Sequence, residues 1–165
     1  MSIEPRARPS DTFAVSAPDV ASSNTGADAE EWSQLWFTLE RHGWGSLALI
    51  PAAPGASARA LAERLAHAAR AYQTTAVEVF DAEHAAPEDV QAVVAAVGGR
   101  AAVGERVLLV VASPLIRASA IPLARAADAA ALVVPLGEVG AADARRTVGA
   151  VGHPHFVGSV TVRGR

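Results

Sequence analysis

The stretch Ser46-Leu-Ala-Leu-Ile-Pro-Ala-Ala-Pro-Gly-Ala-Ser-Ala-Arg-Ala-Leu61 decides the fold of this chain. Its apolar beginning, Leu47 to Ile50, is typical of a buried β-strand. Small, turn-forming residues follow from Pro51 to Ala56, and an alanine-rich helical segment comes directly after them. A strand that leads through a tight turn into a helix is the first half of a β–α–β unit, so this stretch favours an α/β protein.

The turn in this stretch has the outline of a phosphate-binding loop without its chemical groups. A loop of pattern GxxxxGK[ST] supplies a lysine for the phosphates and a hydroxyl for magnesium. Here Ser57 stands at the second glycine, Ala58 at the lysine and Arg59 at the hydroxyl residue. The degenerate loop comprises Pro54, Gly55, Ala56, Ser57, Ala58 and Arg59. Backbone N–H groups at the helix start allow residual anion binding, but we favour a plain β–α turn.

Composition narrows the class of protein. The chain has 165 residues, a formal net charge of -3 and no cysteine, which suits one main domain and excludes a disulfide framework. It has no apolar run near the roughly 20 residues of a membrane span, and we expect no secretory signal. Acidic and basic residues are mixed, without a basic stripe, so we expect no nucleic-acid partner. These features fit a cytoplasmic protein.

Five short apolar runs alternate with helical segments along the chain. The expected strands are Ser46–Ile50, Thr75–Phe80, Arg106–Ala112, Ala131–Pro135 and Phe156–Val162. The expected helices between them are Ala56–Tyr72, Pro87–Val97, Ala118–Ala127 and Ala141–Val148. This alternation predicts an α/β three-layer sandwich with a mainly parallel sheet of five or more strands. Residues 1–28, rich in Ser, Pro, Ala and Asp, predict a disordered N-terminal tail before a domain over residues 29–165.

A helix is expected before the first of these strands, from Ala29 to His42. Its apolar residues recur with helical spacing and share one face: Trp32, Leu35, Trp36 and Leu39. This face either packs on the sheet or offers large aromatic side chains to a partner, and we leave both alternatives open. Phe37 lies off that face and is the better interface candidate. The candidate interface residues are therefore Trp32, Trp36 and Phe37.

The order of these segments resembles the bacterial tyrosine kinases of capsule and exopolysaccharide export, relatives of the partition ATPases with a deviant P-loop. Glu30–Leu39 occupies the place of the family's first helical motif. Pro51–Ala60 is similar to its phosphate loop, with the Ala-Ala-Pro-Gly core intact. Val77–Glu83 looks like the second acidic motif, with Asp81 and Glu83 at the acidic positions.

Three later segments extend the resemblance to about Val162. Val107–Pro114 follows the shape of the third motif, but Ala112 replaces its metal-binding aspartate. Ala126–Pro135 and Phe156–Val160 resemble two further strands of the family. The resemblance implies a P-loop NTPase-like fold.

The positions at which this chain departs from the family all concern phosphoryl transfer by the family's kinases. The lysine, the magnesium-binding hydroxyl and the third-motif aspartate are absent at Ala58, Arg59 and Ala112. Ser33 and Trp36 stand at two arginine positions that link subunits in the family's ring, and the C-terminal tyrosine cluster is missing. Phosphoryl transfer needs the lysine, the metal and the metal's ligands together. We therefore expect no catalytic residue, no metal and no cofactor.

The remaining acids and histidines give weaker signals. We interpret Asp81 and Glu83, the residual acidic motif, as strand-end carboxylates that face solvent rather than as metal ligands. An enzyme of another class that uses these two acids and His84 is a third alternative. His153 and His155 flank a proline in a loop and are expected on the surface rather than at a metal.

The resemblance implies a non-catalytic, pseudokinase-like scaffold or regulator in bacterial exopolysaccharide and capsule biosynthesis and export. Its implied partner is the cytoplasmic part of an inner-membrane polysaccharide chain-length regulator, which would hold the chain at the inner membrane. Assembly with further copies of the chain is also compatible with the family. The alternative is a nucleotide- or anion-binding switch of the partition ATPase type.

Overall fold

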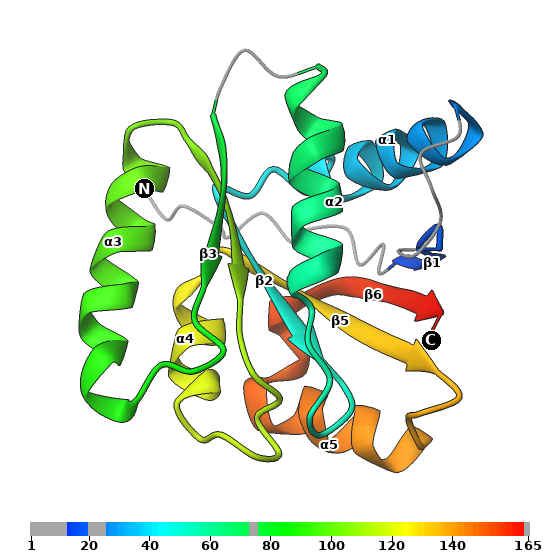
Figure 1. Cartoon of the computed structure of the whole chain (residues 1–165). Helices are drawn as coiled ribbons and strands as arrows, with labels where there is room; N and C mark the ends of the chain where they lie inside the picture. Colours follow the sequence, from blue (N-terminus) through cyan, green and yellow to red (C-terminus); the bar gives the residue numbers. More distant parts are fainter. Residues whose placement is uncertain (1–12, 20–25, 73–75, 164–165) are drawn as a thin grey trace, which may run out of the picture.

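The computed structural model describes residues 13–19, 26–72 and 76–163 of the chain (Figure 1). Over these residues the strands are β1 Phe13–Ser16, β2 Ser46–Pro51, β3 Val77–Asp81, β4 Arg106–Val110, β5 Ala129–Leu136 and β6 Phe156–Arg163. The α-helices are α1 Gly26–Glu40, α2 Arg59–Arg70, α3 Val90–Ala102, α4 Ala120–Ala126 and α5 Ala141–Val151. Two short 3-10 helices, η1 Pro87–Asp89 and η2 His153–His155, precede α3 and β6.

The strands of the described residues form one six-stranded sheet in the order β1-β6-β5-β2-β4-β3, and each neighbouring pair is parallel. The predicted α/β fold with helices on both faces of a parallel sheet is confirmed, and it is consistent with a P-loop NTPase-like three-layer sandwich. All five expected strands are present, and their ends coincide with the expected ends or differ by at most two residues; the expected start at Thr75 lies outside the described residues.

Two hydrophobic cores lie on the two faces of the sheet. Leu47 and Leu49 of β2 pack with residues of α1 and α2. Ala48 and Ile50 of the same strand pack with residues of α3, α4 and α5. Successive side chains of a strand point to opposite faces, so β2 contributes to both cores and is apolar at every position from Leu47 to Ile50.

The expected disordered tail is wrong for part of the N-terminal segment. Phe13–Ser16 form strand β1 at the sheet edge, and α1 already begins at Gly26; residues 1–12 and 20–25 lie outside the described residues. The strand pairs with β6, where Phe13 lies opposite Gly158. A Cβ atom on Gly158 would come within 2.4 Å of the Phe13 carbonyl oxygen. The glycine is therefore what lets β1 approach β6.

The aromatic face of α1 packs inward. Trp32 is 4% exposed and Trp36 is fully buried, and the Trp36 ring meets the Trp44 ring edge to face at 5.6 Å. The expectation that Trp32 and Trp36 serve as interface residues is wrong, because both side chains fill the core between α1 and the sheet. Phe37 is 43% exposed, so it is the one expected interface residue that lies on the surface.

Among the described helices, none combines the length and the apolar composition that a bilayer span requires.

Candidate functional site

The candidate site lies where the carboxyl ends of β2, β4 and β5 meet. After β2 the chain turns to α2 on one face of the sheet, whereas after β4 and β5 it turns to α4 and α5 on the other face. Ligands of open α/β sheets bind at such a topological switch point, outside the carboxyl ends of the strands. The degenerate loop that follows β2 therefore occupies the position in this fold where a ligand site is expected.

The loop between β2 and α2 is a tight turn whose last residue faces the core. Gly55 has a φ of +80°, a left-handed conformation that favours glycine. Ala58 precedes α2 and is fully buried in the core shared with α1. Helix α2 begins at Arg59, later than the expected Ala56, and Ser57 Oγ accepts the Arg59 N–H at 3.1 Å. At the position of the missing lysine, the methyl group of Ala58 thus packs in the core, and no cation points toward the carboxyl ends of the strands.

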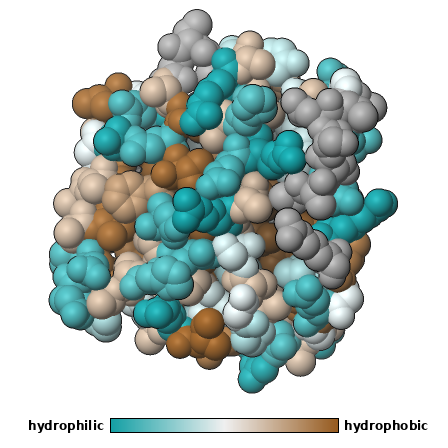
Figure 2. Space-filling model, viewed as in Figure 1, coloured by the Kyte–Doolittle hydropathy of each residue, from teal (hydrophilic) through white to brown (hydrophobic). Residues whose placement is uncertain are grey.

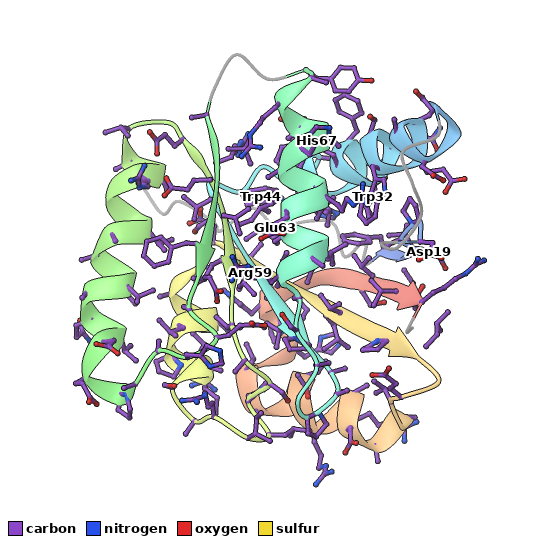
Figure 3. All side chains as sticks on the ribbon, in the orientation of Figure 1. Asp19, Trp32, Trp44, Arg59, Glu63 and His67 are labelled. Carbon is purple, nitrogen blue, oxygen red and sulfur yellow. The ribbon has the colours of Figure 1, made fainter. Side chains whose placement is uncertain are left out.

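Arg59 connects the loop to the end of β3. Its Nε donates to Glu63 Oε1 at 2.9 Å, and its Nη1 lies 3.2 Å from Asp81 Oδ2. Figure 3 shows Arg59 and Glu63 one turn apart along α2. The hydrogen bond to Glu63 and the charges of Glu63 and Asp81 raise the pKa of the Arg59 guanidinium above its usual value. Arg59 is therefore engaged by two carboxylates within the chain.

The residual acidic motif folds into a compact turn after β3. Asp81 Oδ1 accepts the N–H of Glu83 at 3.0 Å, while Oδ2 faces Arg59. Glu83 is half-buried, and its negative charge also contributes to the raised pKa of Arg59. The structure brings together Arg59, Asp81 and Glu83 from two separate sequence motifs. Asp81 is a strand-end carboxylate, as expected, but its partner is a cation of the same chain.

The segment after β4 has no polar side chain at position 112, where the family's third motif has its aspartate. Ala112, which stands at the third-motif aspartate, is 8% exposed, and the next residue, Ser113, is fully buried. Ser119 Oγ donates to the Ala85 carbonyl at 2.9 Å, which ties this segment to the one after β3. The segments that follow β3 and β4 are thus joined by a hydrogen bond between neutral groups.

These residues do not fit a magnesium–nucleotide complex. Magnesium prefers oxygen ligands in octahedral geometry, yet a guanidinium stands beside Asp81 and a methyl group replaces the third-motif carboxylate at Ala112. In the part of the chain that the structure describes, no group of three or more histidine and acidic residues could hold a metal ion. Asp81 is paired with Arg59, whereas Glu83 Oε1 is buried, contrary to the expectation that Glu83 faces solvent, and has no hydrogen-bond partner within the described residues.

The histidines lie away from this crevice or at its margin. His84 is exposed and lines a hollow of about 620 Å³ between the end of β3 and α3, together with Phe80 and Asp89. His155 is partly buried, and its Nε2 lies 2.6 Å from the Ala124 carbonyl oxygen, to which it donates in one tautomer. His153 is exposed in η2.

Comparison of the chain with models of protein families, with curated proteins and with solved structures finds no match.

Sequence reasoning missed two arrangements. The ion pair from Arg59 to Glu63 has a local signal, because residues four apart on a helix face each other, but the link to Asp81 depends on how α2 and β3 pack. The second arrangement is a surface contact between Phe37 of α1 and Tyr72 after α2, whose rings lie 5.1 Å apart. No local pattern predicts that contact, because the two residues belong to different helical segments.

Proposed function

We propose that this chain is a non-catalytic, pseudokinase-like protein that acts as a scaffold or regulator in bacterial exopolysaccharide and capsule biosynthesis and export. One observation carries the non-catalytic part. Arg59, at the position of the magnesium-binding hydroxyl, is paired with Asp81 of the residual acidic motif. The guanidinium of Arg59 therefore occupies the place where, in a catalytic relative, a metal ion would be bound.

The neighbouring positions support the same proposal. Phosphoryl transfer depends on a lysine and on metal ligands that neutralise charge on the phosphates. Ala58 and Ala112 supply neither, and both are buried. What the loop retains is a tight β–α turn that holds α2 against the sheet. The polysaccharide setting, the partner on an inner-membrane chain-length regulator and assembly with further copies rest on the resemblance alone.

A calorimetric titration tests the non-catalytic part. We expect no saturable heat when ADP with magnesium, or the non-hydrolysable ATP analogue with magnesium, is added up to millimolar concentration. Binding at micromolar concentration that the Asp81→Asn substitution weakens would instead favour the nucleotide-binding switch. ATP turnover that Arg59→Ala abolishes would overturn the proposal.

Genetics in the organism that encodes this chain tests the biological part of the proposal. We expect deletion of the gene to lower polysaccharide export, and we expect the wild type and the Arg59→Ala variant to restore it equally. Glycosyltransferase and chain-length-regulator genes beside this gene would support the setting. Normal export in the deletion strain would contradict it.

A further inference from the structure

Phe37 and Tyr72 form an exposed aromatic ridge across α1 and the end of α2. Their side chains are 43% and 54% exposed, and their rings meet edge to face with centroids 5.1 Å apart. The chain has eight Phe, Trp and Tyr residues, all of them described by the structure, and these are the two that are exposed. Aromatic side chains are enriched among residues that dominate the binding energy of protein interfaces.

A hollow lies on each side of this ridge. The first, of about 200 Å³, lies between α1 and α2 and is lined in part by Glu30, Trp32, Arg64, His67 and Tyr72. Figure 3 shows Trp32 of α1 and His67 of α2 in this region. The second is more open, has a volume of about 700 Å³ and is lined by Gln34, Phe37, Thr38, Glu40, Arg41 and Arg106.

The volume of the first hollow limits what it can accept. Small-molecule and cofactor sites typically enclose about 300–1,000 Å³, so 200 Å³ is too little for a nucleotide or a cofactor. It suits a single apolar side chain of a partner, with the indole of Trp32 in its lining. On the face shown in Figure 2, hydrophobic residues form small separate patches among hydrophilic residues. Polar and charged side chains such as Gln34 and Glu30 also line the two hollows, so a partner needs polar contacts around its apolar anchor.

The charges around the two hollows favour an acidic partner. Three arginines and one histidine line them, against two glutamates, although the chain as a whole carries a net charge of -3. Arg106 lies over the Trp44 ring at 5.5 Å, which holds its guanidinium in place. Complementary charge across an interface selects the partner and speeds its association.

We propose that the ridge of Phe37 and Tyr72, with its two hollows, binds an acidic segment of a partner protein. One apolar side chain of that segment enters the hollow between α1 and α2, and carboxylates of the same segment face Arg41 and Arg106. This inference rests on the proposed scaffold function and assigns the docking to one face of α1 and α2. That face lies on the opposite side of the sheet from α3, α4 and α5.

Site-specific photo-crosslinking in the organism that encodes this chain tests this inference. A photoreactive benzoylphenylalanine replaces Phe37 in one strain and Ile116 in a control strain. Ile116 is 58% exposed and lies in the β4–α4 connection. Mass spectrometry then identifies the crosslinked peptide. We expect position 37, and not position 116, to capture a partner segment in which Asp and Glu exceed Lys and Arg.

Charge reversal provides the second measurement. We expect Arg41→Glu to lower the crosslinking yield at least tenfold, whereas Arg145→Glu, on exposed α5 surface, leaves the yield unchanged. A synthetic peptide with the captured sequence should bind the full chain, and Phe37→Ala should weaken its affinity roughly tenfold or more. Unchanged thermal unfolding of the Phe37→Ala variant excludes misfolding as the cause.

Several results would overturn the inference. The first is that position 37 gives no crosslink, and the second is that positions 37 and 116 give the same product. The others are that position 37 captures lipid, a second copy of this chain, or a segment in which Asp and Glu do not exceed Lys and Arg. The proposed scaffold function fails separately. Measured ATP turnover would overturn that function but would not change the crosslink. If the crosslink is absent while the gene still restores polysaccharide export, only the proposed docking surface is wrong.

Discussion

Arg59 Nη1 lies 3.2 Å from Asp81 Oδ2 and so links the first residue of α2 to the last residue of β3. The same guanidinium contacts Glu63 one turn later in α2. The pair joins two elements at the carboxyl edge of the sheet, where the degenerate loop lies. The contact gives the acidic residue a partner in the free protein, without any ligand.

The first prediction concerns this pair. We expect Arg59→Ala to leave the midpoint of urea unfolding nearly unchanged, because exposed ion pairs contribute little to stability and the Arg59 side chain is 59% exposed. Circular dichroism during a urea titration measures the effect, with Glu63→Gln as the matched control. A large loss of stability in Arg59→Ala alone would show that the pair holds the loop in place.

The second prediction concerns the start of the central strand. Asp128 Oδ2 accepts the N–H groups of Gly45 and Ser46, both at 2.8 Å, and Ser46 Oγ accepts the Asp128 N–H at 3.0 Å. We expect Asp128→Ala to lower the free energy of unfolding by about 1–2 kcal/mol, because two amides lose a charged acceptor. Asp128→Asn, which keeps one acceptor oxygen, should lose less in the same urea titration. Equal losses in both variants would contradict this explanation.

The third prediction concerns the close approach of β1 to β6. A Cβ atom on Gly158 would meet Phe13 backbone and ring atoms at 2.4 to 2.6 Å. We expect Gly158→Ala to cost about 1–3 kcal/mol in chemical unfolding, as overpacking does. Hydrogen exchange of the Ala17 amide, which donates to the Thr161 carbonyl at 2.7 Å, should become faster as β1 separates from β6.

Gly149 provides the control for that substitution. It lies within α5, and a Cβ atom there would have no heavy atom within 4 Å other than those of its chain neighbours and the nearby backbone of its own helix. We expect Gly149→Ala to raise the free energy of unfolding by about 0.5–1 kcal/mol, because alanine is the better helix former. If Gly149→Ala also destabilises the protein, the lack of space around Gly158 does not explain the loss of stability in Gly158→Ala.

The fourth prediction compares two adjacent residues of α1. Trp36 is fully buried, whereas Phe37 is 43% exposed. We expect Trp36→Ala to cost about 3–5 kcal/mol through the cavity that it leaves, and Phe37→Ala to change stability by no more than about 0.5 kcal/mol. Guanidinium titrations of both variants test this. Comparable losses would mean that Phe37 also supports the fold.

Trp36→Phe refines the same comparison. The Trp36 indole N–H has no hydrogen-bond partner within the described part of the chain, so phenylalanine removes a buried donor while it keeps most of the ring. We expect a smaller loss than in Trp36→Ala, measured under the same conditions.

Local patterns were sufficient to predict the main sheet. β2 and β4 are continuous apolar runs, and such runs indicate strands that are buried on both faces. The helical spacing of Trp32 and Trp36 also predicted their shared face correctly. It could not decide between packing and partner binding, because a partner surface and a core face have the same periodicity.

Contacts between distant segments could not be predicted in this way. β1 has four residues, and Ser16 contacts Thr161, which is 145 positions away, so its stability depends on a partner that no local window contains. The Arg59–Asp81 pair likewise requires the placement of α2 beside β3. The buried orientation of Ala58 follows from the turn at Pro54 and Gly55, which delays the start of α2 to Arg59.

The parallel pairing of β1 with β6 has a consequence for how the protein is synthesised. Ribosomes make β1 before the other described strands and β6 after them, and Val15 pairs with Val160, which is 145 positions later. The edge strand therefore has no native neighbour until β6 has been synthesised, and loop closure over such a distance slows folding. During synthesis the nascent N-terminal strand has an unpaired edge, and such edges are where aggregation and chaperone recognition begin.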